Sequence, residues 1–144
     1  MRHRKLSKRL SRNSSHRKAM VANLVKSLIK VERLETTLAK AKVASRMADR
    51  MVTLAKGKTV HAQRRAAQLL SDRGIVKKLF REIGPRFVDR AGGYTRVIRL
   101  GTRSGDRASM AILEWVEIVG PVDAEPKEET ADKKEPSKKE PAKV

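Results

Sequence analysis

Apolar residues recur three or four positions apart in several stretches between residues 20 and 83, and this spacing places them on one face of a helix. In the first such stretch Val21, Leu24, Val25 and Leu28 share a face, while Lys26 is left to solvent. In the second stretch the recurring residues are mostly alanines, which permit close approach of another helix or of a sheet. The pattern predicts helices over residues 15–30, 38–56, 60–70 and 71–83.

Residues that favour helix ends stand at the borders of these stretches. Asn13, Ser14 and Ser15 each carry a side-chain oxygen that can accept a hydrogen bond from the first turn of the first helix. We expect Gly84 and Pro85 to end the fourth helix, because proline lacks a backbone N–H and disfavours a helical residue before it.

Segments rich in β-branched or alternating residues predict three strands: Val31–Thr37, Tyr94–Leu100 and Ser109–Val119. Turn-forming residues predict two loops: Pro85–Gly93 and Gly101–Ala108, the second closing a hairpin. The fold class that follows is α+β, a two-layer α/β arrangement of about four helices packed on one face of a small three-stranded sheet. An extended basic N-terminal arm and a disordered C-terminal tail complete the chain.

The composition narrows the class of protein. The 144 residues suffice for one domain with tails. Lysine and arginine number 35 against 16 aspartate and glutamate, a net charge of +19 that favours polyanionic partners. There is no cysteine, which excludes disulfides and thiolate metal sites. The apolar runs are far shorter than the roughly 20 residues that span a bilayer, so we expect a cytoplasmic protein without a membrane partner.

Positive charge is concentrated at the start of the chain. Residues 1–18 hold eight basic residues and no carboxylate. Only Leu6 and Leu10 are large and apolar there, so the segment cannot bury a core. It therefore needs an external anion to be stable in a compact form. Nucleic acid is the interpretation that we favour. The basic residues are Arg2, Arg4, Lys5, Lys8, Arg9, Arg12, Arg17 and Lys18.

The arm fits two other interpretations less well. A solvated tail would mix both signs of charge, and a transit peptide would need an apolar helix face, which the arm lacks. The arm also leads directly into a helix N-terminus, where unpaired N–H groups can face a phosphate. Ser14, Ser15 and His16 add donors at that point.

Residues 121–144 have the opposite character. Four of the five prolines lie there, with six lysines, seven carboxylates and almost nothing apolar. Such a segment cannot offset its chain entropy by burial, and we expect it to be disordered. Its net charge is −1, which leaves +20 on residues 1–120. The predicted organisation is a basic arm at 1–14, a globular domain at 15–120 and a tail at 121–144.

A second basic segment surrounds the Gly92-Gly93 pair. Residues 84–107 contain six arginines and no lysine, and the planar guanidinium fork suits phosphate. Two glycines let a backbone approach a ligand closely, although a tight turn with Phe87 and Tyr94 as core side chains explains them equally well. The candidate binding residues here are Arg86, Arg90, Gly92, Gly93, Tyr94, Thr95, Arg96 and Arg103.

No group of residues suits catalysis or a metal. His3, His16 and His61 are too dispersed for a zinc site, and no cysteine or paired carboxylate assists them. The GGYTR run lacks the GK[ST] of a Walker A loop. Aromatic residues make up 3% of the chain, too few for a sheet that stacks bases. We therefore expect no catalytic residue, no metal and no cofactor.

Three runs of sequence together resemble one family. They are MRHRKLSKRLSRNSSHRKAM at the start, TTLAKAK in the second predicted helix, and LFREIGPRFVDRAGGYTRVIRLGTRSGD. Over about residues 1–118 the chain is similar to the bacterial large-subunit ribosomal protein seventeen family. The resemblance implies a small α/β protein held on large-subunit rRNA near the exterior end of the peptide tunnel. It also implies neighbouring ribosomal proteins as partners, and no catalysis. It implies no function for residues 121–144.

The resemblance also implies binding roles for particular residues. Those matching the family's rRNA-binding start are Arg2, His3, Arg4, Lys5, Arg12, Asn13, Ser14, Ser15, His16 and Arg17. Those matching its second basic block are Arg86, Arg90, Gly92, Gly93, Tyr94, Thr95 and Arg96. Lys8, Arg9 and Arg103 join the candidate set as basic residues of the same two segments. A small-molecule substrate and a homo-oligomer are not expected.

Two functions remain as hypotheses. The first is a structural rRNA-binding protein whose arm neutralises phosphates between RNA segments. The second is a DNA-binding regulator, because the third and fourth predicted helices are joined by a short turn, as in a helix-turn-helix. The basic residues, however, lie in an arm and a loop rather than along one recognition helix. An enzyme acting on RNA would need an acid–base or metal set that the sequence lacks.

Overall fold

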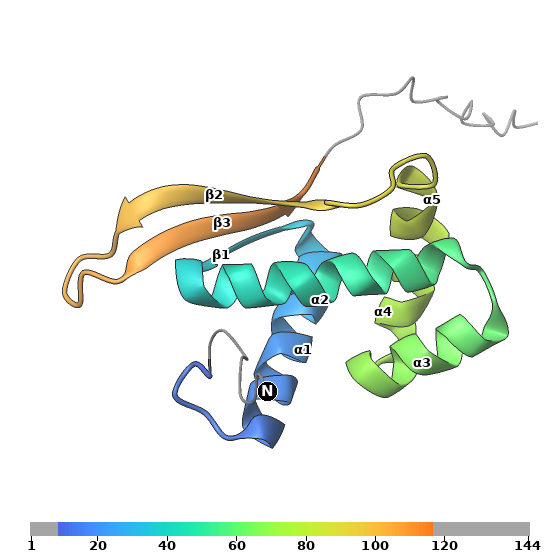
Figure 1. The fold of residues 1–144 in the computed structure, drawn as a ribbon, viewed down its shortest axis with the longest axis horizontal. Helices are drawn as coiled ribbons and strands as arrows, with labels where there is room; N and C mark the ends of the chain where they lie inside the picture. Colours follow the sequence, from blue (N-terminus) through green and yellow to red (C-terminus); the bar gives the residue numbers. More distant parts are fainter. Residues whose placement is uncertain (1–8, 117–144) are drawn as a thin grey trace, which may run out of the picture.

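The computed structural model describes residues 9–116, in which helices pack on a three-stranded sheet (Figure 1). The predicted α+β fold is confirmed. Residues 2–8 of the predicted arm and all of the predicted tail lie outside the described residues. The helical elements are α1 Ser14–Val31, α2 Leu38–Lys56, α3 Val60–Leu70, α4 Arg73–Lys78, the π-helical turn η1 Leu79–Ile83, and α5 Gly84–Arg86. The strands are β1 Arg33–Thr37, β2 Thr95–Thr102 and β3 Ser109–Trp115.

The sheet has β3 in its centre, paired antiparallel with β1 on one side and β2 on the other. Leu34, Leu113 and Val97 lie side by side across the three strands, and Leu113 is fully buried. Because side chains alternate along a strand, this row faces the helices while Arg96 and Glu114 face away from them.

Helix α2 forms the centre of the molecule, since it contacts α1, α3, η1, α5 and all three strands (Figure 1). Its buried face is built largely from small side chains, among them Ala41, Ala44 and Ala48, each with no exposed surface. A face of alanines lets the backbones of neighbouring elements come close, and this is the packing that the sequence predicts. No helix within residues 9–116 is long and apolar enough to cross a membrane.

The prediction that Gly84 and Pro85 end the fourth helix is wrong. The helical path continues through η1 and α5 as far as Arg86, and the Gly84 N–H bonds to the Leu79 carbonyl five residues back. This wider π-type turn changes the hydrogen-bond register where Pro85, which has no N–H to donate, enters the helix. A Cβ atom at Gly84 would lie 2.9 Å from the Cβ of Ala55. Glycine is therefore present for close packing against α2, and the predicted 85–93 loop is non-helical only after Arg86, over residues 87–93.

The predicted start of the first strand also moves. The strand predicted from Val31 begins at Arg33, because α1 includes Val31 and ends at Glu32 with a left-handed φ of 65°. The Glu32 N–H bonds to the Leu28 carbonyl at 2.8 Å, which closes the helix before the strand can start. β-Branched character at Val31 was thus a misleading local signal.

Strand β2 also differs from the prediction at both ends. It starts after Tyr94, which is buried just before the strand, and it continues to Thr102. A register shift between Arg99 and Gly101, with a Gly101 φ of 146°, absorbs one extra residue and extends the hairpin. In β3 the residues after position 116 of the predicted strand lie outside the described residues.

Candidate nucleic-acid interface

The start of α1 is capped by Asn13. Its side-chain oxygen accepts a hydrogen bond from the His16 N–H at 2.9 Å and another from the Ser15 hydroxyl at 3.2 Å. Of the three predicted cap residues, Asn13 therefore fills this position, while Ser14 and Ser15 belong to the first turn. The backbone N–H groups of Ser14 and Ser15 have no acceptor within residues 9–116.

That first turn is open to an anion. Ser14, Ser15 and His16 are exposed, Arg17 is half-buried, and the turn contains no acidic residue. Free N–H groups at a helix N-terminus carry partial positive charge, and neighbouring cations strengthen it. This end of α1 therefore combines backbone donors with basic side chains in one place.

The described part of the arm folds back on itself before α1. Leu10 and Ser11 have positive φ angles of 55° and 51°, and the Arg12 N–H reaches the Arg9 carbonyl at 3.3 Å. The Arg12 guanidinium donates to the Leu10 carbonyl at 2.9 Å, while its buried Nε finds no acceptor in the described residues. Arg12 is thus tied to the turn itself, whereas Arg9 is exposed.

Arg86 is held by a carboxylate on another element. Its two terminal nitrogens donate to the Glu32 carboxylate at 2.8 and 3.1 Å, in bidentate geometry. These hydrogen bonds lower the pKa of Glu32, with the positive charge of Arg86 adding to the effect. Both side chains are more than a third exposed, so the outer edge of the pair faces solvent. Arg86 therefore connects α5 to the end of α1 in addition to any contact it makes outside the chain.

Side-chain hydrogen bonds to its backbone carbonyls hold the loop after α5. The Arg90 Nε donates to the Gly92 carbonyl at 3.1 Å, and the Lys56 ammonium donates to the Arg90 carbonyl at 2.7 Å. Gly93 has a φ of 63°, a conformation that glycine adopts without strain. A Cβ atom at Gly92 or Gly93 would meet nothing within 4 Å. The glycines therefore serve the turn, and the surface around them is open.

Two candidate residues of the same block point inward. Tyr94 is 2% exposed and packs edge-on against Phe87, with ring centroids 5.3 Å apart. The Thr95 hydroxyl donates to Asp49 at 3.2 Å, so its contact with the Ser45 hydroxyl at 2.8 Å makes Ser45 the donor. Tyr94 and Thr95 fix the loop to α2, which is the core alternative that the sequence left open.

The remaining two arginines of the block are exposed and lie beside carboxylates. Arg96 is 3.8 Å from Glu114, across the outer face of the sheet. Arg103 forms a bidentate pair with Asp106 at 3.1 and 2.6 Å within the β2–β3 turn. Hydrogen bonds from Arg103, with a further one from the Ala108 N–H, lower the pKa of Asp106 to about 2. Exposed pairs of this kind are weak, so both arginines keep donors for another anion.

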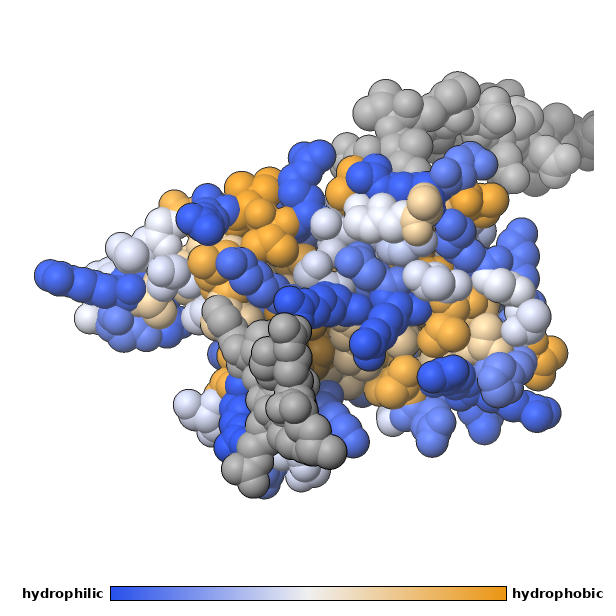
Figure 2. Space-filling view, in the orientation of Figure 1, coloured by the Kyte–Doolittle hydropathy of each residue, from blue (hydrophilic) through white to orange (hydrophobic). Residues whose placement is uncertain are grey.

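The structure does not gather all candidate residues in one place. The β2–β3 turn and the loop after α5 lie toward opposite ends of the long axis, and the start of α1 lies apart from both (Figure 1). Figure 2 shows hydrophilic residues spread over the helices and the hairpin on the visible face, with hydrophobic residues between them. The basic surface is therefore distributed rather than concentrated in a single cleft.

Several exposed cations were absent from the predicted set. Arg99 and Arg107 make no side-chain hydrogen bond or ion pair within the described residues. They belong to the same arginine-only segment, so the absence of lysine could have identified them. A further group lies on α3, α4 and η1, where no local motif marked it.

These features define a class of protein. It is a small, strongly basic two-layer α+β domain with many exposed cations. Among residues 9–116, no three histidine, cysteine or acidic residues come together in a way that could hold a metal ion.

Comparison with known proteins identifies the family. The model of the family described as Ribosomal protein L17 matches residues 20–116. The large ribosomal subunit protein bL17 of Syntrophotalea carbinolica is 52% identical over 117 residues, which cover 81% of this chain and 76% of that protein. That of Thermodesulfovibrio yellowstonii is 50% identical over 129 residues, covering 90% and 97% respectively. The chain therefore belongs to the ribosomal protein L17 family.

Proposed function

We propose that this protein binds large-subunit rRNA through its basic N-terminal arm and through the arginine-rich segment 84–107. As a member of the ribosomal protein L17 family it is a structural component of the large ribosomal subunit, not an enzyme. Its place is the bacterial cytoplasm, where ribosomes lie. By neutralising phosphates that would otherwise repel one another, it stabilises the folded RNA, and it contacts neighbouring ribosomal proteins.

The start of α1 is the observation that carries the proposal. Six basic residues without a carboxylate precede a helix whose first two turns add Arg17 and Lys18. Its first turn is largely exposed and lacks acidic residues, and the N–H groups of Ser14 and Ser15 have no acceptor within residues 9–116. Phosphate is the anion that matches a row of cations followed by a helix N-terminus. The arm cannot reduce its self-repulsion by burial, so binding RNA is what lowers its free energy.

The arginine-rich segment supports a second contact. Four exposed arginines lie along the extended β2–β3 hairpin: Arg96, Arg99, Arg103 and Arg107. Contacts of this kind position a protein on RNA without reading the base sequence. Tyr94 and Thr95 would act indirectly, since they hold the loop in place from inside.

The DNA-binding alternative loses support from the shape of α4. Its regular part spans six residues before the π-helical turn, which is short for a helix that must present side chains along a major groove. Co-sedimentation with large subunits through a high-salt wash separates the two functions, because non-specific DNA binding falls steeply with salt.

A charge-matched comparison tests the arm. The arm variant replaces four cations of the arm with glutamine: Arg2, Arg4, Lys5 and Lys8. The control variant replaces four cations of the tail with glutamine: Lys133, Lys134, Lys138 and Lys139. The arm variant should bind isolated large-subunit rRNA with a salt dependence shallower by about 3 in log–log slope, and its occupancy in gradient-purified large subunits should fall. The tail variant should behave as the wild type. Equal occupancy of the two variants would refute the proposal.

A further inference from the structure

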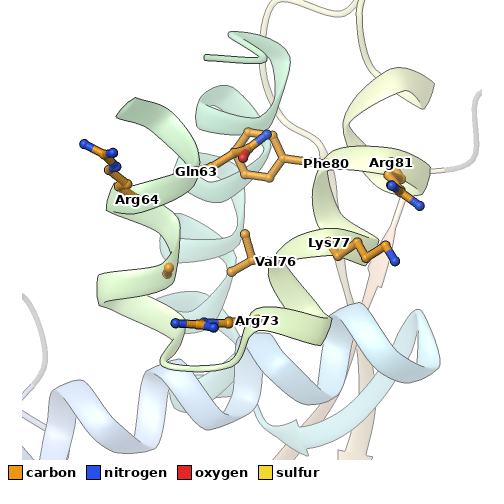
Figure 3. A pocket seen from close by; sticks show the side chains of 8 residues that line it. Gln63, Arg64, Arg73, Val76, Lys77, Phe80 and Arg81 are labelled. Atoms are coloured by element: carbon orange, nitrogen blue, oxygen red, sulfur yellow. The ribbon is translucent and has the colours of Figure 1, made fainter. Parts of the chain in front are cut away.

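A cleft of about 400 Å³ opens between α3 and the α4–η1 segment, and none of the candidate binding residues predicted from the sequence lines it (Figure 3). It is formed where the two helical segments diverge after their short connection. Eight residues line it: Gln63, Arg64, Ala67, Arg73, Val76, Lys77, Phe80 and Arg81.

The interior of the cleft is apolar and contains an aromatic ring. Phe80 and Val76 are 9% and 8% exposed, so each shows only an edge to the cleft. Gln63 is exposed on α3, and its amide extends across the cleft toward the Phe80 ring (Figure 3). The wall therefore offers apolar edges beside one group that can both donate and accept hydrogen bonds.

The rim is positively charged on both helical segments. Arg64 lies on α3, Arg73 and Lys77 on α4, and Arg81 on η1. All four are exposed, and none makes a side-chain hydrogen bond or an ion pair within residues 9–116. This distinguishes them from Arg86, whose guanidinium is held by a carboxylate.

Within residues 9–116, no carboxylate lines the cleft to balance these charges. The two acidic residues of this region have other partners: Asp72 accepts the Ile75 N–H as the cap of α4, and Glu82 lies 3.9 Å from the Lys78 ammonium. Four cations around one cavity repel one another unless an anion lies between them, and the apolar interior suits a ligand that also has an apolar part.

We propose that the cleft binds one unpaired nucleotide of RNA. The base enters beside Phe80 and Val76, Gln63 bonds to the base edge, and the flanking phosphates lie against the cations of the rim. The volume suits a single base with its ribose, since it is at the lower end of the about 300–1,000 Å³ typical of small-ligand sites. A duplex would keep its bases stacked and leave the apolar interior empty. The inference rests on the proposed RNA-binding function and adds a third contact to it.

Two RNA hairpins that differ by one bulged nucleotide provide the test. Their binding to the full-length protein is measured by fluorescence anisotropy at fixed salt. The wild type should bind the bulged hairpin about tenfold more tightly than the fully paired one, which is the value of one inserted base. Gln63→Ala should remove most of that preference, and because Gln63 is exposed, the variant should keep its fold.

Neighbouring arginines give a matched pair of variants. Arg64→Ala should weaken binding of the bulged hairpin about three- to tenfold. It should also make the slope of log affinity against log salt concentration shallower by about one. Arg65 lies outside the cleft, so Arg65→Ala should change the affinity for the bulged hairpin less than about twofold.

Four results would overturn the inference, and they separate it from the proposed function. Equal binding of the two hairpins, or equal effects of Arg64→Ala and Arg65→Ala, would remove the nucleotide site while leaving RNA binding intact. Failure of the wild type to bind either hairpin or large-subunit rRNA would end both proposals. Competition by a polyglutamate peptide as effective as that by the bulged hairpin would assign the cleft to an acidic protein segment instead.

Discussion

Gly84 provides a direct test of how the helices pack. In most helices, replacing glycine with alanine stabilises the fold by about 1 kcal/mol, because alanine loses less backbone entropy. Gly84 has helical dihedral angles, φ −53° and ψ −47°, so a rule based on conformation alone predicts that gain. The added Cβ, however, would lie 2.9 Å from the Cβ of Ala55 and 3.3 Å from the Leu79 carbonyl oxygen.

The contact with Ala55 decides the sign. Its Cβ is attached directly to the α2 backbone and cannot rotate away, so α2 or η1 must shift, at a cost of about 1–3 kcal/mol for overpacking. Subtracting the propensity gain leaves a net loss of about 1 kcal/mol for Gly84→Ala. Gly74 is the control, because a Cβ there meets only the Asp72 carboxylate oxygen at 3.4 Å. Gly74→Ala should therefore be neutral or stabilising.

Urea unfolding of the full-length chain, followed by circular dichroism, measures both variants. The double variant Gly84→Ala with Ala55→Gly removes the clash, so it should be more stable than the sum of the two single changes predicts, by about 1 kcal/mol. A stabilising Gly84→Ala, or strictly additive changes in the cycle, would show that the close approach of η1 to α2 is wrong.

Three further predictions concern the surface. The pKa of Glu32 is lowered in the folded state, so the stability that its ion pair with Arg86 contributes is present above the unfolded pKa and is lost as pH falls through the folded pKa. In urea unfolding at pH 7, Arg86→Gln should lower the free energy of unfolding by about 0.5–1 kcal/mol. The variant should also lose less stability than the wild type when the pH is lowered. Asn13→Ala removes the α1 cap and should cost about 1 kcal/mol by the same measurement. Arg99→Gln with Arg107→Gln should leave stability unchanged while making the salt dependence of rRNA binding shallower by about 2, and an unchanged slope would remove the hairpin from the interface.

The helical half of the fold could be predicted because its signals are local. Helices α2 and α3 have the predicted bounds, since Thr37 and Thr59 stand before them and alanine-rich faces define their inner sides. The continuation past Gly84 and Pro85 could not be predicted, because it depends on a π-helical turn and on the proximity of α2. Tertiary packing there overrides a rule that holds for isolated helices.

The candidate interface was predictable in charge but not in geometry. Six arginines in one segment mark a basic surface, yet the Arg86 pair with Glu32 joins residues 54 positions apart. The sequence left open whether Tyr94 belongs to the binding surface or to the core, because its burial depends on packing against Phe87. Binding roles for residues 2–8, outside the described residues, stay predictions.

The register of β1 has a consequence for the order in which the chain folds. Arg33 pairs with Glu114 and Thr37 with Met110, so the partners are 81 and 73 residues apart. Strand β1 is thus synthesised early but has no sheet partner within the described residues until β3 has been made. The helices between them can pack on α2 from contacts much closer in sequence, whereas closing so long a loop slows strand pairing. The sheet should therefore complete last, with α1 already folded and the arm before it available to bind.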